Sequence, residues 1–289
     1  MKHTTKTLIF KSLNLLPNKI GYSLYHKMQH FFDRSSIESK VKKSEITINK
    51  IIEICNELKI ESANKIIFEF GSGWLPIMPY FFILKCKVKK VFTYDINQHY
   101  EKKVIIKFNS IFSKMYDFNI DIDANSDYNL PKSVEYFPLK NIINEDFSKA
   151  DIVFSRYVLS HVEENDLINM HKKFKSNLKK GSYIIHFISP SDLRQHGDKS
   201  ISMYDFLKYS KEEWSSIMTK FDYHNRWRLP QYIDLFKSLD FEIVYNSYES
   251  VEQGSLNQKL FRELNLHEDF KKYNEEELTA GNIIFVLKV

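Results

Sequence analysis

Apolar runs and amphipathic segments alternate along most of this chain. Seven short apolar runs, rich in β-branched and aromatic residues, predict buried strands. They lie at 66–70, 91–94, 134–137, 151–155, 183–188, 241–245 and 282–287. Apolar residues at helical spacing fill most of the intervals, as at 44–58, 75–84 and 99–115. A helix is also expected directly after the fourth run, with Val158, Leu159 and Val162 as its apolar face. Strands that alternate with helices in this way predict an open α/β sheet.

Two segments do not follow this alternation. Residues 1–60 precede the first strand and predict an N-terminal helical extension, with Ser44 expected as the N-cap of its last helix. Residues 189–239 separate the fifth and sixth strands and are far longer than a usual connection. Within them, Ser210 and Glu213 have the spacing of a capping box, and Pro230 is expected to open a helix. We therefore predict a main domain over 61–289 that carries a helical insertion at 189–239.

The turn that follows the first strand is the centre of the predicted site. Gly71-Ser72-Gly73 ends that strand, and glycine tolerates positive φ and close approach of a ligand to the backbone. The second strand ends at Asp95, 24 residues after Gly71, near the spacing of ~20 at which a carboxylate meets ribose hydroxyls. Leu75 stands where a pyrophosphate-binding turn has a third glycine, which favours a ligand without a pyrophosphate.

The pattern Glu69-x-Gly71-x-Gly73, with an acidic residue closing the next strand, resembles the class I S-adenosylmethionine (SAM)-dependent methyltransferases. The resemblance covers about residues 63–289. It implies a Rossmann-like, doubly wound sheet of seven strands whose last strand is antiparallel, with SAM as the cofactor. The cofactor-binding residues that it implies are Glu69, Gly71, Gly73, Asp95, Ile96 and Arg156.

Two histidines are candidates for the base that takes a proton from a hydroxyl acceptor. His161 follows the fourth strand in Leu159-Ser160-His161-Val162, which is similar to a Leu-x-His-Ile/Val element of many class I methyltransferases. In some of these enzymes the histidine takes part in catalysis; the alternative is a helix-face histidine that hydrogen-bonds locally. His186 lies in the fifth strand among apolar neighbours, either as a satisfied core histidine or as a pocket residue that points at substrate.

The insertion carries the candidate substrate-binding residues Asn225, Arg226 and Arg228. Asn-Arg-x-Arg here, together with Asp95-Ile96-Asn97, resembles a subgroup of methyltransferases associated with surface-polysaccharide synthesis. Ser160 replaces the glutamate usual in that subgroup. The resemblance implies a hydroxyl of a sugar or surface-glycan precursor as acceptor, and the aromatic residues of the insertion would suit sugar faces. A small phenolic or lipid head-group acceptor fits aromatic walls too, and the arginines could instead bond loop carbonyls.

Composition restricts the compartment and the partners. The net charge of +5 comes without a long basic tract, so nucleic-acid binding is not indicated. Cys55 and Cys86 form no Cys-x-x-Cys pair, and lone thiols fit the cytoplasm. Asp192, His196 and Asp198 lack the tight spacing of a metal site. No signal peptide or membrane-spanning run is expected.

The N-terminal residues 1–43 concentrate lysines among leucines and aromatic residues. They predict either a cover for the catalytic core or a surface that meets anionic lipid at the inner face of a membrane.

Three functions therefore remain in view. The first is a SAM-dependent O-methyltransferase. The second is an NAD(P)-dependent oxidoreductase, against which Leu75 and the lack of a Tyr-x-x-x-Lys element argue. The third is a non-catalytic methyltransferase-like domain that binds a partner. The oligomeric state does not follow from the sequence.

Overall fold

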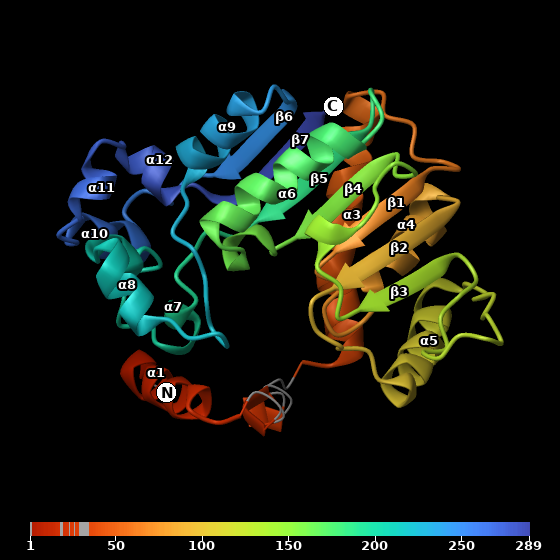
Figure 1. The fold of residues 1–289 in the computed structure, drawn as a ribbon, viewed down its shortest axis with the longest axis horizontal. Coiled ribbons are helices and arrows are strands. Elements are labelled where there is room, and N and C mark those ends of the chain that lie inside the picture. Colours follow the sequence, from red (N-terminus) through yellow and green to blue (C-terminus); the bar gives the residue numbers. More distant parts are fainter. Residues whose placement is uncertain (1, 18–19, 23, 26, 29–34) are drawn as a thin grey trace.

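A single seven-stranded sheet forms the centre of the computed structural model, which describes residues 2–17, 20–22, 24–25, 27–28 and 35–289 (Figure 1). The strand order is β3-β2-β1-β4-β5-β7-β6, and β7 runs antiparallel to both of its neighbours. The strands are β1 Ile66–Phe70, β2 Lys90–Asp95, β3 Val134–Pro138, β4 Ile152–Arg156, β5 Tyr183–Ile188, β6 Glu242–Glu249 and β7 Gly281–Lys288. The predicted Rossmann-like sheet with an antiparallel last strand is confirmed.

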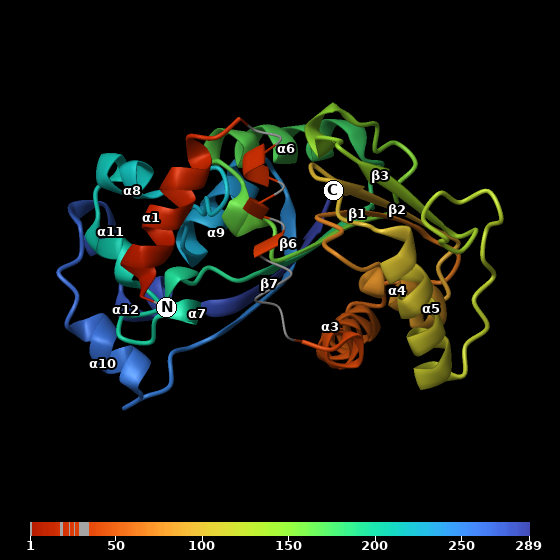
Figure 2. The ribbon, with the colours of Figure 1, turned by 90° about the horizontal axis from the view of Figure 1, so that it is seen from below.

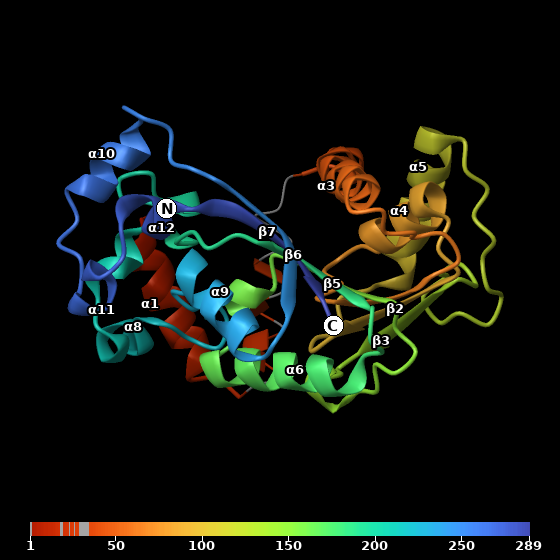
Figure 3. The same cartoon turned by 90° about the horizontal axis from the view of Figure 1, so that it is seen from above.

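Helices cover both faces of the sheet (Figures 2 and 3). On one face lie α3 Ile37–Glu57, α4 Ile77–Cys86 and α5 Lys102–Tyr116. On the other face lie α6 Glu164–Asn177 and α9 Leu229–Ser238. Helix α3 buries Val41, Ile48, Ile51 and Cys55 at spacings of three, four and seven residues, and they join the core that α4, α5 and the sheet share.

Two predicted helix starts are wrong. Helix α3 begins at Ile37 because Ser36 caps it, its hydroxyl accepting from the Ser39 amide at 3.1 Å; Ser44 lies buried within the helix. After β4 we expected a helix through Val158 and Val162. The chain instead forms the short 3-10 turn η2 Leu159–His161, and α6 starts only at Glu164. The turn ends at His161 because Val162 is extended, with a φ of −97° and a ψ of 137°, and so leaves the right-handed helical region.

The insertion between β5 and β6 contains α7 Arg194–Gly197, η3 Asp205–Lys208, α8 Lys211–Ile217 and the start of α9. The predicted capping box is confirmed, because Ser210 and Glu213 each accept from the other's backbone amide. Pro230 lies in the first turn of α9, as predicted.

A second group of helices, between β6 and β7, was not predicted. Outside this group, a short turn, η1 Ile142–Asn144, follows β3. The group itself consists of α10 Leu256–Arg262, α11 Glu268–Lys271 and α12 Glu275–Thr279. These helices pack on the insertion through an apolar cluster that includes Phe206, Trp214, Phe261 and Phe270.

Helix α1 His3–Asn14 lies against the insertion rather than against the sheet (Figure 2). Phe10 packs near Phe221, with ring centroids 6.5 Å apart, and the His3 amide donates to Asp198 at 3.0 Å. Part of the predicted 1–43 surface, including residues 29–34, lies outside the described residues. Over the part of the chain that the structure describes, no helix is both long and apolar enough to cross a bilayer.

Candidate functional site

Two cavities border the Gly71-Ser72-Gly73 turn at the carboxyl ends of the parallel strands. The larger holds about 360 Å³ and is lined in part by Gly71, Asp95, Ile96, His161 and Tyr223. The smaller holds about 270 Å³, and its lining includes Glu69, Gly73, Arg156, Lys40 and Lys43. The structure thus gathers all the predicted cofactor-binding residues, and His161, around one turn. This is the edge of an open α/β sheet at which ligands bind.

The backbone of the turn needs glycine. Gly71 has a φ of 77° and Gly73 a φ of 62°, in the left-handed region that favours glycine. A Cβ on Gly71 would lie 2.1 Å from Cγ2 of Val158, which also lines the larger cavity. Only a residue without a side chain therefore fits between β1 and the loop after β4.

Asp95 presents a nearly buried carboxylate beside this turn. Its Oδ2 accepts from the Gly73 amide at 3.3 Å, and its Oδ1 accepts from the Asn97 amide at 2.9 Å. Next to it, the side chain of Ile96 is 68% exposed and lines the larger cavity. A carboxylate that can accept hydrogen bonds from hydroxyls suits the sugar of a nucleoside. The apolar walls beside it, to which Ile142 also contributes, suit the flat base.

Glu69, the second-last residue of β1, lines the smaller cavity. The Thr93 hydroxyl donates to its Oε2 at 2.5 Å. Burial raises the pKa of Glu69 to about 7, although the Thr93 hydrogen bond and the nearby Arg156 charge both lower it. Burial also lowers the pKa of Arg156, against the attraction of Tyr157 and Glu69. A carboxylate and a guanidinium here match the ammonium and carboxylate of an amino acid.

His161 is placed so that one ring nitrogen has a defined proton. Its Nδ1 lies 3.1 Å from the carbonyl oxygen of Tyr223, and because a carbonyl only accepts, Nδ1 must carry the hydrogen. Nε2 is then the acceptor in the neutral ring. Although the residue keeps exposed surface, desolvation lowers the pKa of His161. The charge of His224 lowers this pKa further, and the hydrogen bond to the Tyr223 carbonyl raises it. His161 is therefore neutral and able to accept a proton at neutral pH.

The structure does not bring His186 to this site. It is fully buried, lines neither cavity, and contacts Ser155 Oγ at 2.8 Å and His171 Nε2 at 3.1 Å. His171 Nδ1 donates to the Leu167 carbonyl at 2.7 Å, so its Nε2 accepts from His186 Nε2, and Ser155 donates to His186 Nδ1. Of the two expectations for His186, the structure has the satisfied core histidine.

Asn225, Arg226 and Arg228 point at backbone carbonyls rather than into either cavity. The Asn225 amide donates to the carbonyls of Leu159 and Val162, both at 2.8 Å, and thereby holds the turn that carries His161. Arg226 donates to carbonyls of the insertion, those of Phe206 and Tyr209.

Arg228, only 1% exposed, donates to the carbonyls of Pro190 and Leu278 and of its own segment. For both arginines the structure has the second expectation, hydrogen bonds to loop carbonyls, and Asn225 bonds backbone carbonyls as well.

Most aromatic side chains of the insertion are also internal. Tyr204, Trp214 and Trp227 are buried in apolar clusters. Tyr223 differs, because it lines the larger cavity while its carbonyl holds His161. Of the aromatic faces expected for a sugar, this one lies at the site.

Some lining residues were missed from the sequence. The loop 140–143 after β3 lines the larger cavity, and its position at the carboxyl end of a parallel strand would have pointed to it. Lys40 and Lys43 line the smaller cavity from α3, and no sequence signal joins that helix to the turn.

Asp192 and Asp198, which were considered as metal ligands, have protein partners instead. Asp192 pairs with Arg194 at 2.6 Å, and Asp198 accepts from His3. In the part of the chain that the structure describes, no group of three or more His, Cys, Asp or Glu side chains could hold a metal ion.

Comparisons with known proteins add similar structures. No protein-family model matches the chain, and no curated protein does. Among solved structures, a SAM-dependent methyltransferase from Methanosarcina mazei has a TM-score of 0.44 at 15% identity, over 78% of this chain and 92% of that one. Magnesium protoporphyrin IX methyltransferase from Synechocystis, solved with bound SAH, has a TM-score of 0.46 at 10% identity, over 85% and 83%. At these identities, with TM-scores below 0.5, neither similarity identifies a family, a cofactor or a substrate for this chain.

Proposed function

We propose that this protein is a SAM-dependent methyltransferase that acts on a hydroxyl group. The observation that carries the proposal is the glycine turn between two cavities, with Asp95 on one side and Glu69 on the other. The two carboxylates, the guanidinium of Arg156 and the apolar wall at Ile96 fit a nucleoside joined to an amino acid. A dinucleotide would need a close approach at Leu75, where the third glycine is missing.

Each group has a role in holding this ligand. When bound, SAM supplies a methyl group on a positively charged sulfur and leaves as a neutral thioether. Asp95 would accept hydrogen bonds from the ribose hydroxyls, and Glu69 and Arg156 would bind the amino-acid end. Gly71 and Gly73 let the backbone lie against the ligand.

His161 is the proposed base. A hydroxyl becomes a good nucleophile only as it loses its proton, and His161, which lines the larger cavity and has Nε2 as its acceptor nitrogen, would take that proton. The Tyr223 carbonyl keeps the proton on Nδ1, and Asn225 fixes the turn beneath the ring. We assign Asn225 and the neighbouring arginines to positioning rather than to substrate contact.

The acceptor that we propose is a sugar hydroxyl, on a glycan precursor of the surface-polysaccharide type. Its support is the aromatic face of Tyr223 beside charged side chains that can bond hydroxyls, namely Lys140, Glu163, Asp166 and Lys220. A small phenol or a lipid head group would use the same aromatic face.

We also propose that the protein is cytoplasmic and that α1 contacts the anionic inner face of a membrane. Leu8 and Leu15 are 67% and 87% exposed and lie seven residues apart, with Lys11 exposed on the same side of the helix. The opposite side, Phe10 and Leu13, is the one that packs on the insertion. An exposed apolar stripe with lysines is the pattern of helices that lie on anionic lipid.

Methyl transfer tests the proposal directly. The purified protein is given radiolabelled SAM with nucleotide sugars, lipid-linked glycans and small phenols in parallel. We expect label in a glycan acceptor, and loss of transfer in His161→Ala. Label only in the phenols would reject the sugar and keep the methyltransferase. No transfer to any acceptor, with SAM still bound, would favour the non-catalytic domain.

A further inference from the structure

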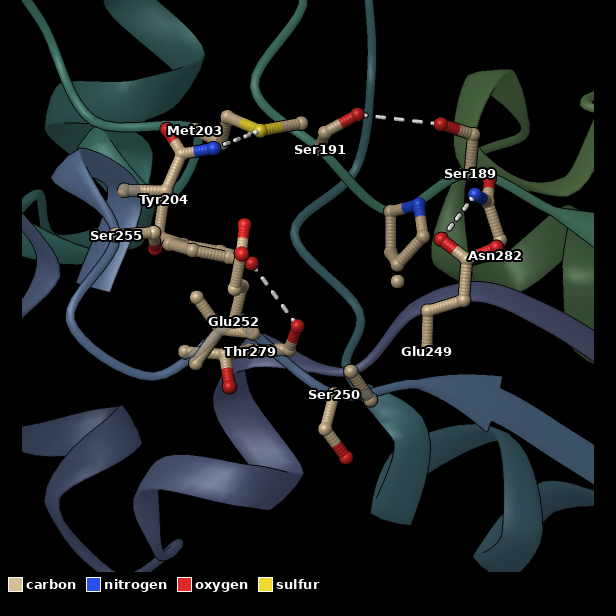
Figure 4. A pocket seen from close by; sticks show the side chains of 15 residues that line it. Ser189, Ser191, Met203, Tyr204, Glu249, Ser250, Glu252, Ser255, Thr279 and Asn282 are labelled. Carbon is tan, nitrogen blue, oxygen red and sulfur yellow. Dashed lines mark hydrogen bonds between the residues drawn. The ribbon is translucent and has the colours of Figure 1, made fainter.

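A separate cavity lies where the chain leaves β5 and β6 and enters β7 (Figure 4). It holds about 210 Å³. Ser189 and Ser191 follow β5, Glu249 ends β6, and Asn282 lies near the start of β7. None of the residues around the Gly71 turn lines it, so it is a different site from the one described above.

The lining of this cavity is rich in hydroxyl groups and carries negative charge. Its polar side chains are those of Ser189, Ser191, Tyr204, Glu249, Ser250, Glu252, Ser255, Asn257, Thr279 and Asn282. Among its lining residues, all of them in the described stretch 189–282, there is no Lys, Arg or His. Phosphate or carboxylate ligands would therefore meet two carboxylates without a compensating cation.

Only part of this polar surface is used within the protein. Ser189 and Ser191 bond each other at 3.1 Å, Tyr204 donates to the Thr279 carbonyl at 3.0 Å, and Asn282 donates to Glu249 at 2.6 Å (Figure 4). Each hydroxyl and carboxylate in these pairs keeps lone pairs for a further donor. The exposed carboxylate of Glu252 makes no hydrogen bond or ion pair with any residue that the structure describes.

The cavity wall is fixed rather than loose. Arg228 donates to the carbonyl of Pro190, which lines the cavity, and to the carbonyl of Leu278, next to the lining residue Thr279. The same short segment carries Asn225 and Tyr223, which hold the His161 turn. A cavity wall that is already held by hydrogen bonds loses little conformational entropy when a ligand binds. This explains what the second arginine of the Asn-Arg-x-Arg motif does.

We propose that this cavity binds a small ligand that carries several hydroxyl groups and an ammonium group, such as an amino sugar. Hydroxyls can both donate to and accept from the serine, tyrosine and amide groups. The ammonium group pairs with Glu252 and Glu249. Met203, Val251 and Ala280 offer apolar surface to the C–H face of a ring. The inference concerns binding and does not depend on methyl transfer.

Calorimetric titration of the full chain with glucosamine, glucose and glucuronate tests it. These probes share a ring and differ in charge, and we expect glucosamine to bind most tightly and glucuronate not to bind. Glu252→Gln should weaken glucosamine about three- to fivefold, as expected for a partly exposed ion pair. The matched control is Glu263→Gln, an exposed glutamate outside the cavity, which should leave the affinity unchanged.

Three results would overturn the proposal. The first is that glucosamine does not bind at concentrations that saturate weak sugar sites. The second is that glucuronate binds as tightly as glucosamine. The third is that the two variants bind glucosamine with equal affinity. Because no SAM is present, failure here leaves the methyltransferase proposal as it stands.

Discussion

The Nδ1 atom of His161 lies 3.1 Å from the carbonyl oxygen of Tyr223. This contact joins the loop after β4 to the insertion between β5 and β6, 62 residues further along the chain. It also decides which nitrogen of His161 carries the proton, so it leaves Nε2 as the acceptor of a ring that lines the larger cavity. The insertion thus sets the chemistry of a residue that lies outside it.

His161→Ala should lower kcat by about 10²–10⁴-fold, the usual contribution of a general base, while SAH affinity stays unchanged. The wild-type rate should fall as pH drops through the lowered pKa of His161, below 6.5, because the protonated ring cannot accept a proton. His196→Ala, an exposed histidine outside both cavities, is the control. Near-normal turnover of His161→Ala would leave positioning alone as the source of catalysis.

Glu69 predicts a pH-dependent affinity for the cofactor. Burial raises its pKa to about 7, and only the ionised form attracts an ammonium group. SAH should therefore bind about tenfold more tightly at pH 8 than at pH 6. Glu69→Gln should bind more weakly at pH 8 and lose this dependence. A variant that keeps the wild-type pH profile would remove Glu69 from the amino-acid end of the site.

The contribution of Glu69 to the free energy of unfolding changes with pH in the opposite direction. Because its carboxyl pKa is raised in the folded chain, the fold becomes less stable as pH rises from 4.5 to 7.

The outer side of α1 predicts binding to anionic vesicles. Leu8→Ser combined with Leu15→Ser should reduce co-sedimentation at least about tenfold, because a buried leucine contributes about 1.5–3 kcal/mol. Leu256→Ser is the matched control, since Leu256 is 64% exposed on α10. High salt should weaken binding of the wild type. If the double variant and the control pellet equally, the membrane proposal fails.

The buried pair His171 and His186 predicts loss of stability in acid. Burial lowers the pKa of His171 to about 4 and that of His186 well below 6.5, so the unfolded chain binds protons that the folded chain does not. The free energy of unfolding should fall by about 2 kcal/mol between pH 7 and pH 5 from His171 alone. Imidazole NMR signals of the folded protein should show no titration of either ring above pH 5. Titration of either ring near pH 6.5 would contradict the buried hydrogen-bond chain.

The sheet could be predicted from the sequence because buried strands appear as short apolar runs. All seven predicted runs overlap observed strands. Helices α10 to α12 were missed because they are only four to seven residues long, too short for a clear helical period. Their N-caps were visible, however: Ser255 accepts from Gln258, and Asn274 and Glu277 form a capping box.

The candidate site was predictable only in part. Gly71 and Asp95 could be placed together because the carboxyl ends of parallel strands share one edge. The partners of Asn225, Arg226 and Arg228 could not, because they are backbone carbonyls brought near by tertiary packing. The same limit applies to His186, whose partner His171 comes from the helix α6.

The proposal that SAM binds over the Gly71 turn is tested most directly by calorimetric titration with its product thioether, SAH, and with NADH. We expect one SAH to bind per chain and NADH not to bind. Asp95→Ala should weaken SAH by about ten- to a hundredfold, since charge-assisted hydrogen bonds contribute about 1.5–3 kcal/mol each. The control is Asp127→Ala, because Asp127 is exposed and lines neither cavity; this variant should bind SAH like the wild type. Thermal unfolding should show that both variants are folded. Absence of SAH binding, tighter binding of NADH, or an unchanged SAH affinity in folded Asp95→Ala would contradict the account.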